Sequence, residues 1–208
     1  MNESMMDASC RDFATLLAAK EAVPGGGGAA AYVGALGVAL CSMVGNFTTG
    51  KKAYAEVEED VQSMIGRAET VRGRLLELVD EDARAFEPLS RAYGIPKDDP
   101  TRAAVLEQAT KAACKPPLEM MRQICRSIDL LEEMGRKGSR MLLSDVGCGV
   151  LLARAALEAA AINVFVNTKA LADRAHAAAL ESEVDIMLAT YVPRAEEVAA
   201  DVVGKIRG

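Results

Sequence analysis

Asp82 is the residue whose type and position point most directly to chemistry. Apolar residues recur every three or four positions between Tyr54 and Tyr93, as on one face of a helix, and Asp82 falls on that face between Leu78 and Phe86. A carboxylate that faces a core loses its hydration, so its pKa can move toward the range used in proton transfer. A buried Asp that pairs with an arginine or caps a neighbouring helix explains the pattern equally well, because structural ion pairs also shift pKa values. Asp82 is therefore a candidate acid–base residue.

The second candidate feature is a run of four glycines at the start of a helical pattern. Gly25, Gly26, Gly27 and Gly28 follow Pro24 directly. Glycines in this place can expose backbone N–H groups at the positive end of a helix dipole, which suits an anion or a polarised oxygen. A tight turn that needs positive φ is the alternative.

Three polar residues mark a later apolar segment. Asn163 and Asn167 are one helical turn apart on an otherwise apolar helix, where their amides need hydrogen-bond partners. A polar heterocycle could be the partner, or the two amides could bind each other and a backbone carbonyl. Asp145 follows Ser144 at the expected start of the same helix, where the helix dipole favours a carboxylate. These residues are candidates for binding or for assisting Asp82.

The segment from Gly45 to Lys52 imitates the phosphate loop GxxxxGK[ST]. Lys52 stands where a hydroxyl residue would bind magnesium, and a helix is expected where a strand should precede the loop, so nucleotide hydrolysis is excluded. Lys51 and Lys52 remain a cationic pair that either neutralises a carboxylate tail or is solvated. The single histidine, His176, is interpreted as structural or exposed, and no Ser–His–Asp grouping indicates a hydrolase triad.

The elements that must position these residues are helices. Helical periodicity covers the chain and strand signals are nearly absent, so residues 1–208 are predicted to form one all-α domain. Helices are expected over residues 9–20, 27–47, 54–93, 98–137 with a kink at 116–117, and 144–166, followed by a last stretch to 206 that is broken near 173 and after 182 and kinked at 193. This pattern predicts a bundle of five or six long helices around a buried central helix, with surplus apolar surface that meets a second copy of the chain.

The composition narrows the class of protein. The chain carries 24 Lys and Arg against 30 Asp and Glu, and a net charge of −6 disfavours nucleic acid or an anionic membrane as a partner. Residues 22–50 are uncharged and long enough to cross a bilayer, but they are rich in Gly and Ala, which favours a helix buried within a protein. Acidic residues at the N-terminus argue against a signal peptide, and five Cys without a CxxC pair indicate reduced thiols and no zinc site. We expect a cytoplasmic protein without a metal.

Several segments together resemble the cyclodeaminase/cyclohydrolase family of tetrahydrofolate enzymes. This family includes the cyclodeaminase domain of formiminotransferase-cyclodeaminase and stand-alone methenyltetrahydrofolate cyclohydrolases. The segments that carry the resemblance occur in the same order and span nearly the whole chain: residues 24–31, 34–37, 42–54, 80–86, 94–97, 144–145 and 163–167. The family usually has Ser after three glycines, whereas this chain has Gly28 there and so offers no hydroxyl.

The resemblance implies an all-helical fold, assembly as at least a dimer, a folate substrate, and neither a metal nor an organic cofactor. It implies one of two reactions at the same carbon: hydrolysis of 5,10-methenyltetrahydrofolate to 10-formyltetrahydrofolate, or closure of 5-formiminotetrahydrofolate with loss of ammonia. A length of 208 residues without a fused formiminotransferase domain favours the hydrolase. A non-catalytic helical binder or scaffold would share the helical pattern but would not require a desolvated Asp82.

The resemblance also implies roles for the candidate residues. Asp82 would act as general base or stabilise the cationic carbon, and Asp145 would assist or orient. The glycine loop would bind the pterin or its carbonyl through backbone N–H groups. Lys51 or Lys52 would contact the glutamate tail, and Asn163 with Asn167 would contact the polar edge of the pterin.

Overall fold

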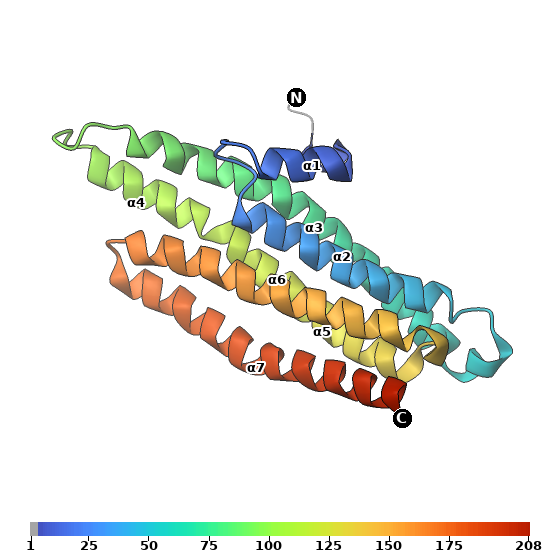
Figure 1. Cartoon of the computed structure of the whole chain (residues 1–208). Coiled ribbons are helices and arrows are strands. Elements are labelled where there is room, and N and C mark those ends of the chain that lie inside the picture. The colour runs from blue at the N-terminus through green and yellow to red at the C-terminus, as the bar shows by residue number, and fades with distance from the viewer. Residues whose placement is uncertain (1–3) are drawn as a thin grey trace.

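Long helices that lie side by side make up the protein in the computed structural model, which describes residues 4–208 (Figure 1). In chain order the elements are η1 (Met5–Asp7), α1 (Cys10–Leu17), α2 (Gly26–Asn46), η2 (Lys52–Val57), α3 (Glu58–Tyr93), α4 (Arg102–Ala113), α5 (Lys115–Lys137), η3 (Arg140–Leu142), α6 (Leu143–Ala170) and α7 (Arg174–Arg207), where η denotes a 3₁₀ helix. No strand occurs in this part of the chain. The prediction of an all-α fold is confirmed.

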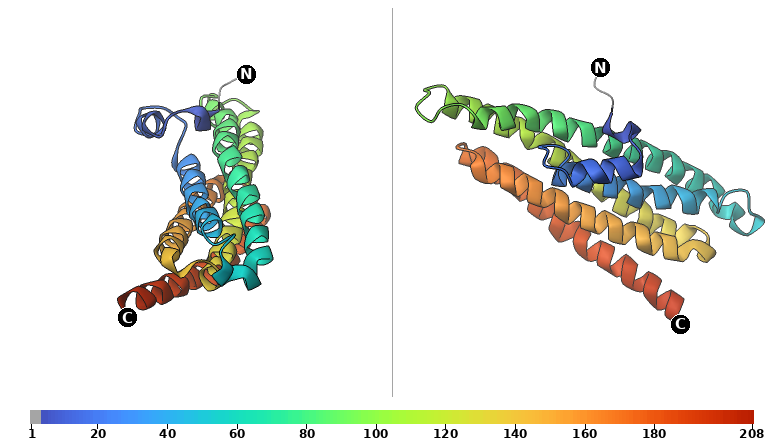
Figure 2. Two further views of the ribbon diagram at one scale, coloured as in Figure 1. Left: turned by 90° about the vertical axis from the view of Figure 1, so that its right-hand side faces the viewer. Right: turned by 45° about the horizontal axis from the view of Figure 1, so that its top comes forward.

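The core of the bundle lies around α2. This helix packs against α3, α5 and α6, while α7 covers α5 and α6 on the far side (Figures 1 and 2). Val38, Leu75, Ile124 and Leu157, one from each of the four central helices, are fully buried and belong to one continuous apolar cluster. Burial of such side chains is the main contribution to the stability of this arrangement.

Helices α2 and α6 approach each other closely at two glycines. A Cβ on Gly37 would lie 2.9 Å from the carbonyl oxygen of Gly149, and a Cβ on Gly149 would lie 2.9 Å from the carbonyl oxygen of Gly37. Glycine at both positions therefore lets the two backbones touch. Small residues recur every three or four positions along α2, at Ala30, Gly34, Gly37 and Cys41, and form a ridge that another backbone can approach.

Helix α2 is central to the bundle, as predicted, but one side of it is not covered by its own chain. Its outer face carries Val33, Leu36 and Leu40, and 43% of Leu36 is exposed. Apolar residues therefore occur on every side of α2, but other helices cover only its inner side.

Several predicted helix boundaries also differ. The segment after residue 98 forms two helices, α4 and α5, which meet at Cys114, just before Pro116 and Pro117. The predicted break after Ser182 is wrong, since α7 is continuous. The polar residues there lie on its solvent face, where Glu183 forms an ion pair with Arg122.

Within residues 4–208, two helices have the length and composition of membrane spans. They are α2 and the segment Arg140–Ala170, which contains α6. The two helices pack against each other, so their inner faces contribute to the bundle core.

Candidate functional site

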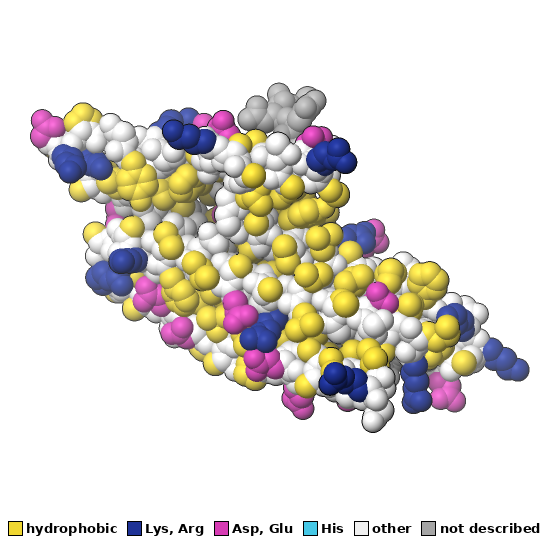
Figure 3. Space-filling model, viewed as in Figure 1, with side chains coloured by type: hydrophobic (Ala, Val, Ile, Leu, Met, Phe, Trp, Pro, Cys, Tyr) yellow, Lys and Arg dark blue, Asp and Glu magenta, His cyan; other side chains and the backbone are white. Residues whose placement is uncertain are grey.

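A cavity of about 220 Å³ lies where α2 begins and brings together six of the predicted site residues. Its lining consists of Ala22, Val23, Gly25, Gly26, Gly27, Asp82, Phe86, Ala113, Asn163, Val166 and Asn167. These residues come from the turn before α2, from α2 itself, and from α3, α4 and α6. Figure 3 shows that the surface is hollowed between the arm formed by α3 and α4 and the arm formed by α6 and α7.

Asp82 lies directly against the first turn of α2. A Cβ on Gly27 would be only 2.7 Å from Cγ and from Oδ1 of Asp82, so any larger residue would displace the carboxyl group. None of Gly25, Gly26, Gly27 or Gly28 has a positive φ, since the positive values in the described chain are confined to two other glycines. Close approach to Asp82, rather than a left-handed turn, is therefore the reason for glycine at position 27.

Burial sets the protonation behaviour of Asp82. Loss of hydration raises the pKa of its carboxyl group to about 6, and a hydrogen bond from the backbone N–H of Gly28 offsets part of this increase. Asp82 forms no ion pair with any residue between 4 and 208. The predicted inward orientation is confirmed. Asp82 has no arginine partner among the described residues, but its contact with the Gly28 N–H in the first turn of α2 fits the other alternative, a carboxylate that caps a neighbouring helix.

Each of the two asparagines uses one of its two amide N–H groups within the protein. Asn163 Nδ2 donates to the carbonyl oxygen of Ala159 at 2.8 Å, and Asn167 Nδ2 donates to that of Ala113 at 2.9 Å. Both side chains are half-buried and line the cavity. The amide oxygens, which accept no hydrogen bond from the described residues, are left for a ligand, together with the second N–H of each amide.

Phe86 is a lining residue that the sequence analysis assigned only to the core. It follows Asp82 by one helical turn on α3 and is half-buried. Its position four residues after Asp82 was the available signal, because residues at i and i+4 share a helix face. An aromatic ring here provides a flat apolar wall for a planar ligand.

The remaining candidates lie outside the cavity. Gly28 is buried beneath it, next to Pro24 and Val79, and reaches the site only through its N–H. Lys51 and Lys52 follow the other end of α2, about 30 Å away by the rise of 1.5 Å per residue along this helix.

Asp145 is also at the far end of the bundle. It lies in the first turn of α6, 18 positions before Asn163, which corresponds to about 27 Å along the helix. The structure therefore does not place Asp145 beside Asp82 within one chain. His176 is at the start of α7 and does not line the cavity.

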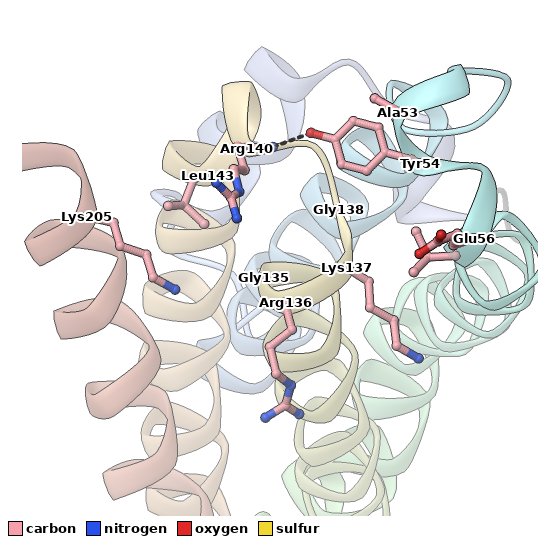
Figure 4. A pocket seen from close by; sticks show the side chains of 11 residues that line it. Ala53, Tyr54, Glu56, Gly135, Arg136, Lys137, Gly138, Arg140, Leu143 and Lys205 are labelled. Atoms are coloured by element: carbon pink, nitrogen blue, oxygen red, sulfur yellow. Dashed lines mark hydrogen bonds between the residues drawn. The ribbon is translucent and has the colours of Figure 1, made fainter.

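A larger cavity of about 730 Å³ lies at this far end, between η2, the turn after α5 and the end of α7 (Figure 4). Arg136, Lys137, Arg140 and Lys205 line it, and the backbone N–H of Arg140 donates to Tyr54 Oη at 3.1 Å. Three of the four cations already pair with carboxylates, and Arg140 is the exception among the described residues. This cavity contains no buried acid–base group, so we assign the candidate active site to the smaller one.

Metal binding and cysteine chemistry are the other possibilities to consider for residues 4–208. No three His, Cys, Asp or Glu side chains lie close enough together to hold a metal ion. Burial raises the pKa of the Cys41 and Cys125 thiols to about 12, so neither is a thiolate near neutral pH.

Comparison with known proteins identifies the family. The family model described as formiminotransferase-cyclodeaminase matches residues 9–186. The chain belongs to this family. A methenyltetrahydrofolate cyclohydrolase from Methylorubrum extorquens is 42% identical over 91% of this chain and 93% of that relative.

Two further family members link the chain to the cyclodeaminases. The formimidoyltransferase-cyclodeaminase of Mus musculus is 33% identical over 82% of this chain, which spans only 32% of the mouse protein. The crystal structure of formiminotetrahydrofolate cyclodeaminase from Thermotoga maritima superimposes with a TM-score of 0.84 at 27% identity, covering 95% of this chain and 98% of that one. The helical architecture is thus the architecture of the family.

Proposed function

We propose that the chain is a methenyltetrahydrofolate cyclohydrolase, which hydrolyses 5,10-methenyltetrahydrofolate to 10-formyltetrahydrofolate. The observation that carries the proposal is the desolvated carboxyl group of Asp82, held against the first turn of α2 in a cavity that Asn163 and Asn167 also line. The 42% identity to a relative with this name, over nearly the full length of both chains, supports the same reaction.

Asp82 acts as the general base in this proposal. A water molecule adds to the cationic methenyl carbon between N5 and N10 while the carboxylate accepts its proton. The hydroxyl group of the resulting tetrahedral carbon then loses its proton to solvent and becomes the formyl carbonyl on N10, while the bond to N5 breaks and N5 takes up the proton from Asp82, so that one proton is released overall. A carboxyl group with a pKa near 6 can both accept and return the proton near neutral pH.

The first turn of α2 supplies hydrogen-bond donors. The N–H groups of Gly26 and Gly27 fall among the first N–H groups of a helix, which have no partner within it. They suit the pterin carbonyl oxygen, and Asn163 with Asn167 suit the polar pterin edge. A cavity of about 220 Å³ is smaller than the roughly 300 Å³ at the lower end of ordinary ligand sites, so it takes the pterin while the rest of the folate extends outward.

A second copy of the chain covers the outer face of α2 and α6 in this proposal. That face is apolar: Leu36, Leu151, Ile162 and Val166 are each 43–65% exposed, and Figure 3 shows these helices covered mainly by hydrophobic side chains. Glu158 of α6 also lies on this face, where Arg154 pairs with it, so the mainly apolar face can meet its own copy around a two-fold axis without an uncompensated charge.

The size of the face fits a homodimer. Two adjacent helices about 30 Å long present roughly 600 Å², and a stable interface buries about 800 Å² per partner. Helix α1 stands off the bundle beside α2, as the left view of Figure 2 shows, and its Leu16 and Leu17 are exposed. The proposed enzyme is cytoplasmic and acts on a small folate rather than on nucleic acid or a membrane.

Formiminotetrahydrofolate cyclodeaminase is the second candidate, because the structural relative from Thermotoga maritima carries that name. Both reactions pass through a tetrahedral carbon between two nitrogens. The deciding experiment offers the purified protein each substrate separately and follows the absorbance of methenyltetrahydrofolate and the release of ammonia. Loss of methenyl absorbance without ammonia supports the hydrolase; ammonia released from the formimino substrate supports the deaminase.

The third possible result of this experiment is that the protein is a helical binder or scaffold without catalytic activity. It would leave both substrates unchanged at high protein concentration and would overturn the proposal.

A further inference from the structure

The orientation of the two cavity asparagines follows from their partners. A carbonyl oxygen can only accept a hydrogen bond, so the atom of each amide that contacts Ala159 or Ala113 must be Nδ2. The assignment of nitrogen and oxygen in both side chains is thereby fixed by the protein.

Pro117 provides the reason for the Asn167 contact. In a continuous helix the carbonyl of Ala113 would accept from the N–H of residue 117, but proline has none. Helix α4 ends at Ala113 and α5 begins at Lys115, so this carbonyl needs a partner from elsewhere. Asn167 of α6 supplies it at 2.9 Å and joins the two arms that border the cavity.

The amide nitrogen of Asn163 is held by a hydrogen bond within its own helix. Its Nδ2 donates to the carbonyl of Ala159, one turn earlier on α6. The Oδ1 atoms of Asn163 and Asn167 make no hydrogen bond to any residue from 4 to 208. Two accessible acceptors therefore lie one helical turn apart on the cavity wall.

We infer that Asn163 and Asn167 act as an acceptor pair that selects ligands by their N–H donors, the 2-amino group and N3–H of a reduced pterin. This inference rests on the proposed function and adds to it which groups of the ligand, hydrogen-bond donors or acceptors, the two side chains recognise. Each amide keeps one N–H but two oxygen lone pairs, so acceptor positions outnumber donors on this wall. A ligand edge without N–H groups would leave both oxygens unpaired, which is costly in a half-buried site. Asp82 is then free to act at the reacting carbon instead of binding the pterin edge.

The test compares two ligands that lack the methenyl carbon and so are not turned over. Dissociation constants for tetrahydrofolate and for its 2-desamino-2-methyl analogue are measured by calorimetry on the wild type and on Asn163→Leu and Asn167→Leu. The wild type should prefer tetrahydrofolate by about tenfold or more, since one hydrogen bond is lost with the amino group and an acceptor is left unpaired. Each variant should reduce this preference several-fold.

Asn46→Leu is the matched control, because Asn46 is exposed at the far end of α2 and should retain the full preference. If Asn167→Leu does not fold, Asn163→Leu still decides, because its internal bond lies within one helix. An unchanged preference in Asn163→Leu would overturn the acceptor-pair inference while leaving the proposed function intact. No binding of tetrahydrofolate to the wild type would overturn both.

Discussion

The carboxyl group of Asp82 occupies the space that a side chain at Gly27 would need. We expect Gly27→Ala to push the carboxyl group aside, because the new Cβ would lie 2.7 Å from Cγ of Asp82. Asp82 can rotate away, so the free energy of unfolding should change by no more than about 1 kcal/mol. Misplacement of the base should lower kcat/KM at least about tenfold. Steady-state kinetics and urea unfolding of the same variant measure the two effects.

Gly73→Ala is the control for this substitution. Gly73 is an exposed residue of α3, and a Cβ there meets nothing within 4 Å. It should keep full activity and gain up to about 1 kcal/mol of stability from helix propensity. Equal activity in the Gly27 and Gly73 variants would contradict the role assigned to the contact with Asp82.

The raised pKa of Asp82 predicts that its charge destabilises the folded protein. The folded state binds the proton more tightly than the unfolded chain, so the cost of the ionised carboxylate appears as the pH rises from about 4 to 6 and stays constant above. Asp82→Asn should therefore increase the free energy of unfolding by about 1–3 kcal/mol at pH 8. The increase should disappear near pH 4. A destabilised Asp82→Asn protein at pH 8 would instead indicate a structural role.

The same pKa predicts the pH dependence of catalysis. A general base must be ionised, so kcat/KM should be constant above about pH 6 and fall tenfold per pH unit below it. Burial of the carboxyl group is the cause, and an unperturbed Asp would move the fall to near pH 4. A profile of kcat/KM between pH 4.5 and 8, over the range in which the protein stays folded, separates these two results.

The apolar face of α2 and α6 predicts the oligomeric state. Leu36→Lys introduces a charge into the centre of this face and should convert a dimer into a monomer in light scattering. Ile186→Lys makes the same change in charge at an exposed position of α7, outside the face, and should leave the dimer intact. A wild-type protein that is monomeric at micromolar concentration would contradict the proposed dimer.

Much of the site could be predicted from residue spacing. The four-residue steps from Leu78 through Asp82 to Phe86 placed the carboxylate on the inner side of α3, and the structure agrees. Asn163 and Asn167 share a helix face for the same reason. Periodicity predicts which side of a helix a residue occupies, and this was sufficient for residues that meet at one level of the bundle.

Spacing within one helix did not show which segments of different helices lie side by side. Lys51 and Asp145 were grouped with Asp82, although α2 and α6 each extend about 30 Å between the cavity and these residues. The boundary between α4 and α5 depended on the missing N–H groups of two consecutive prolines. Surplus apolar surface was expected, but an apolar sequence does not show which side of α2 its own chain covers and which side is left exposed.

The central claim is that Asp82 performs the proton transfer at the methenyl carbon. The most direct measurement is the turnover of 5,10-methenyltetrahydrofolate, followed by its absorbance, for Asp82→Asn beside the wild type, with circular dichroism to show that both are folded. The proposed mechanism predicts a loss of at least about 100-fold in kcat for the folded variant. Unchanged turnover in a folded Asp82→Asn protein would contradict it.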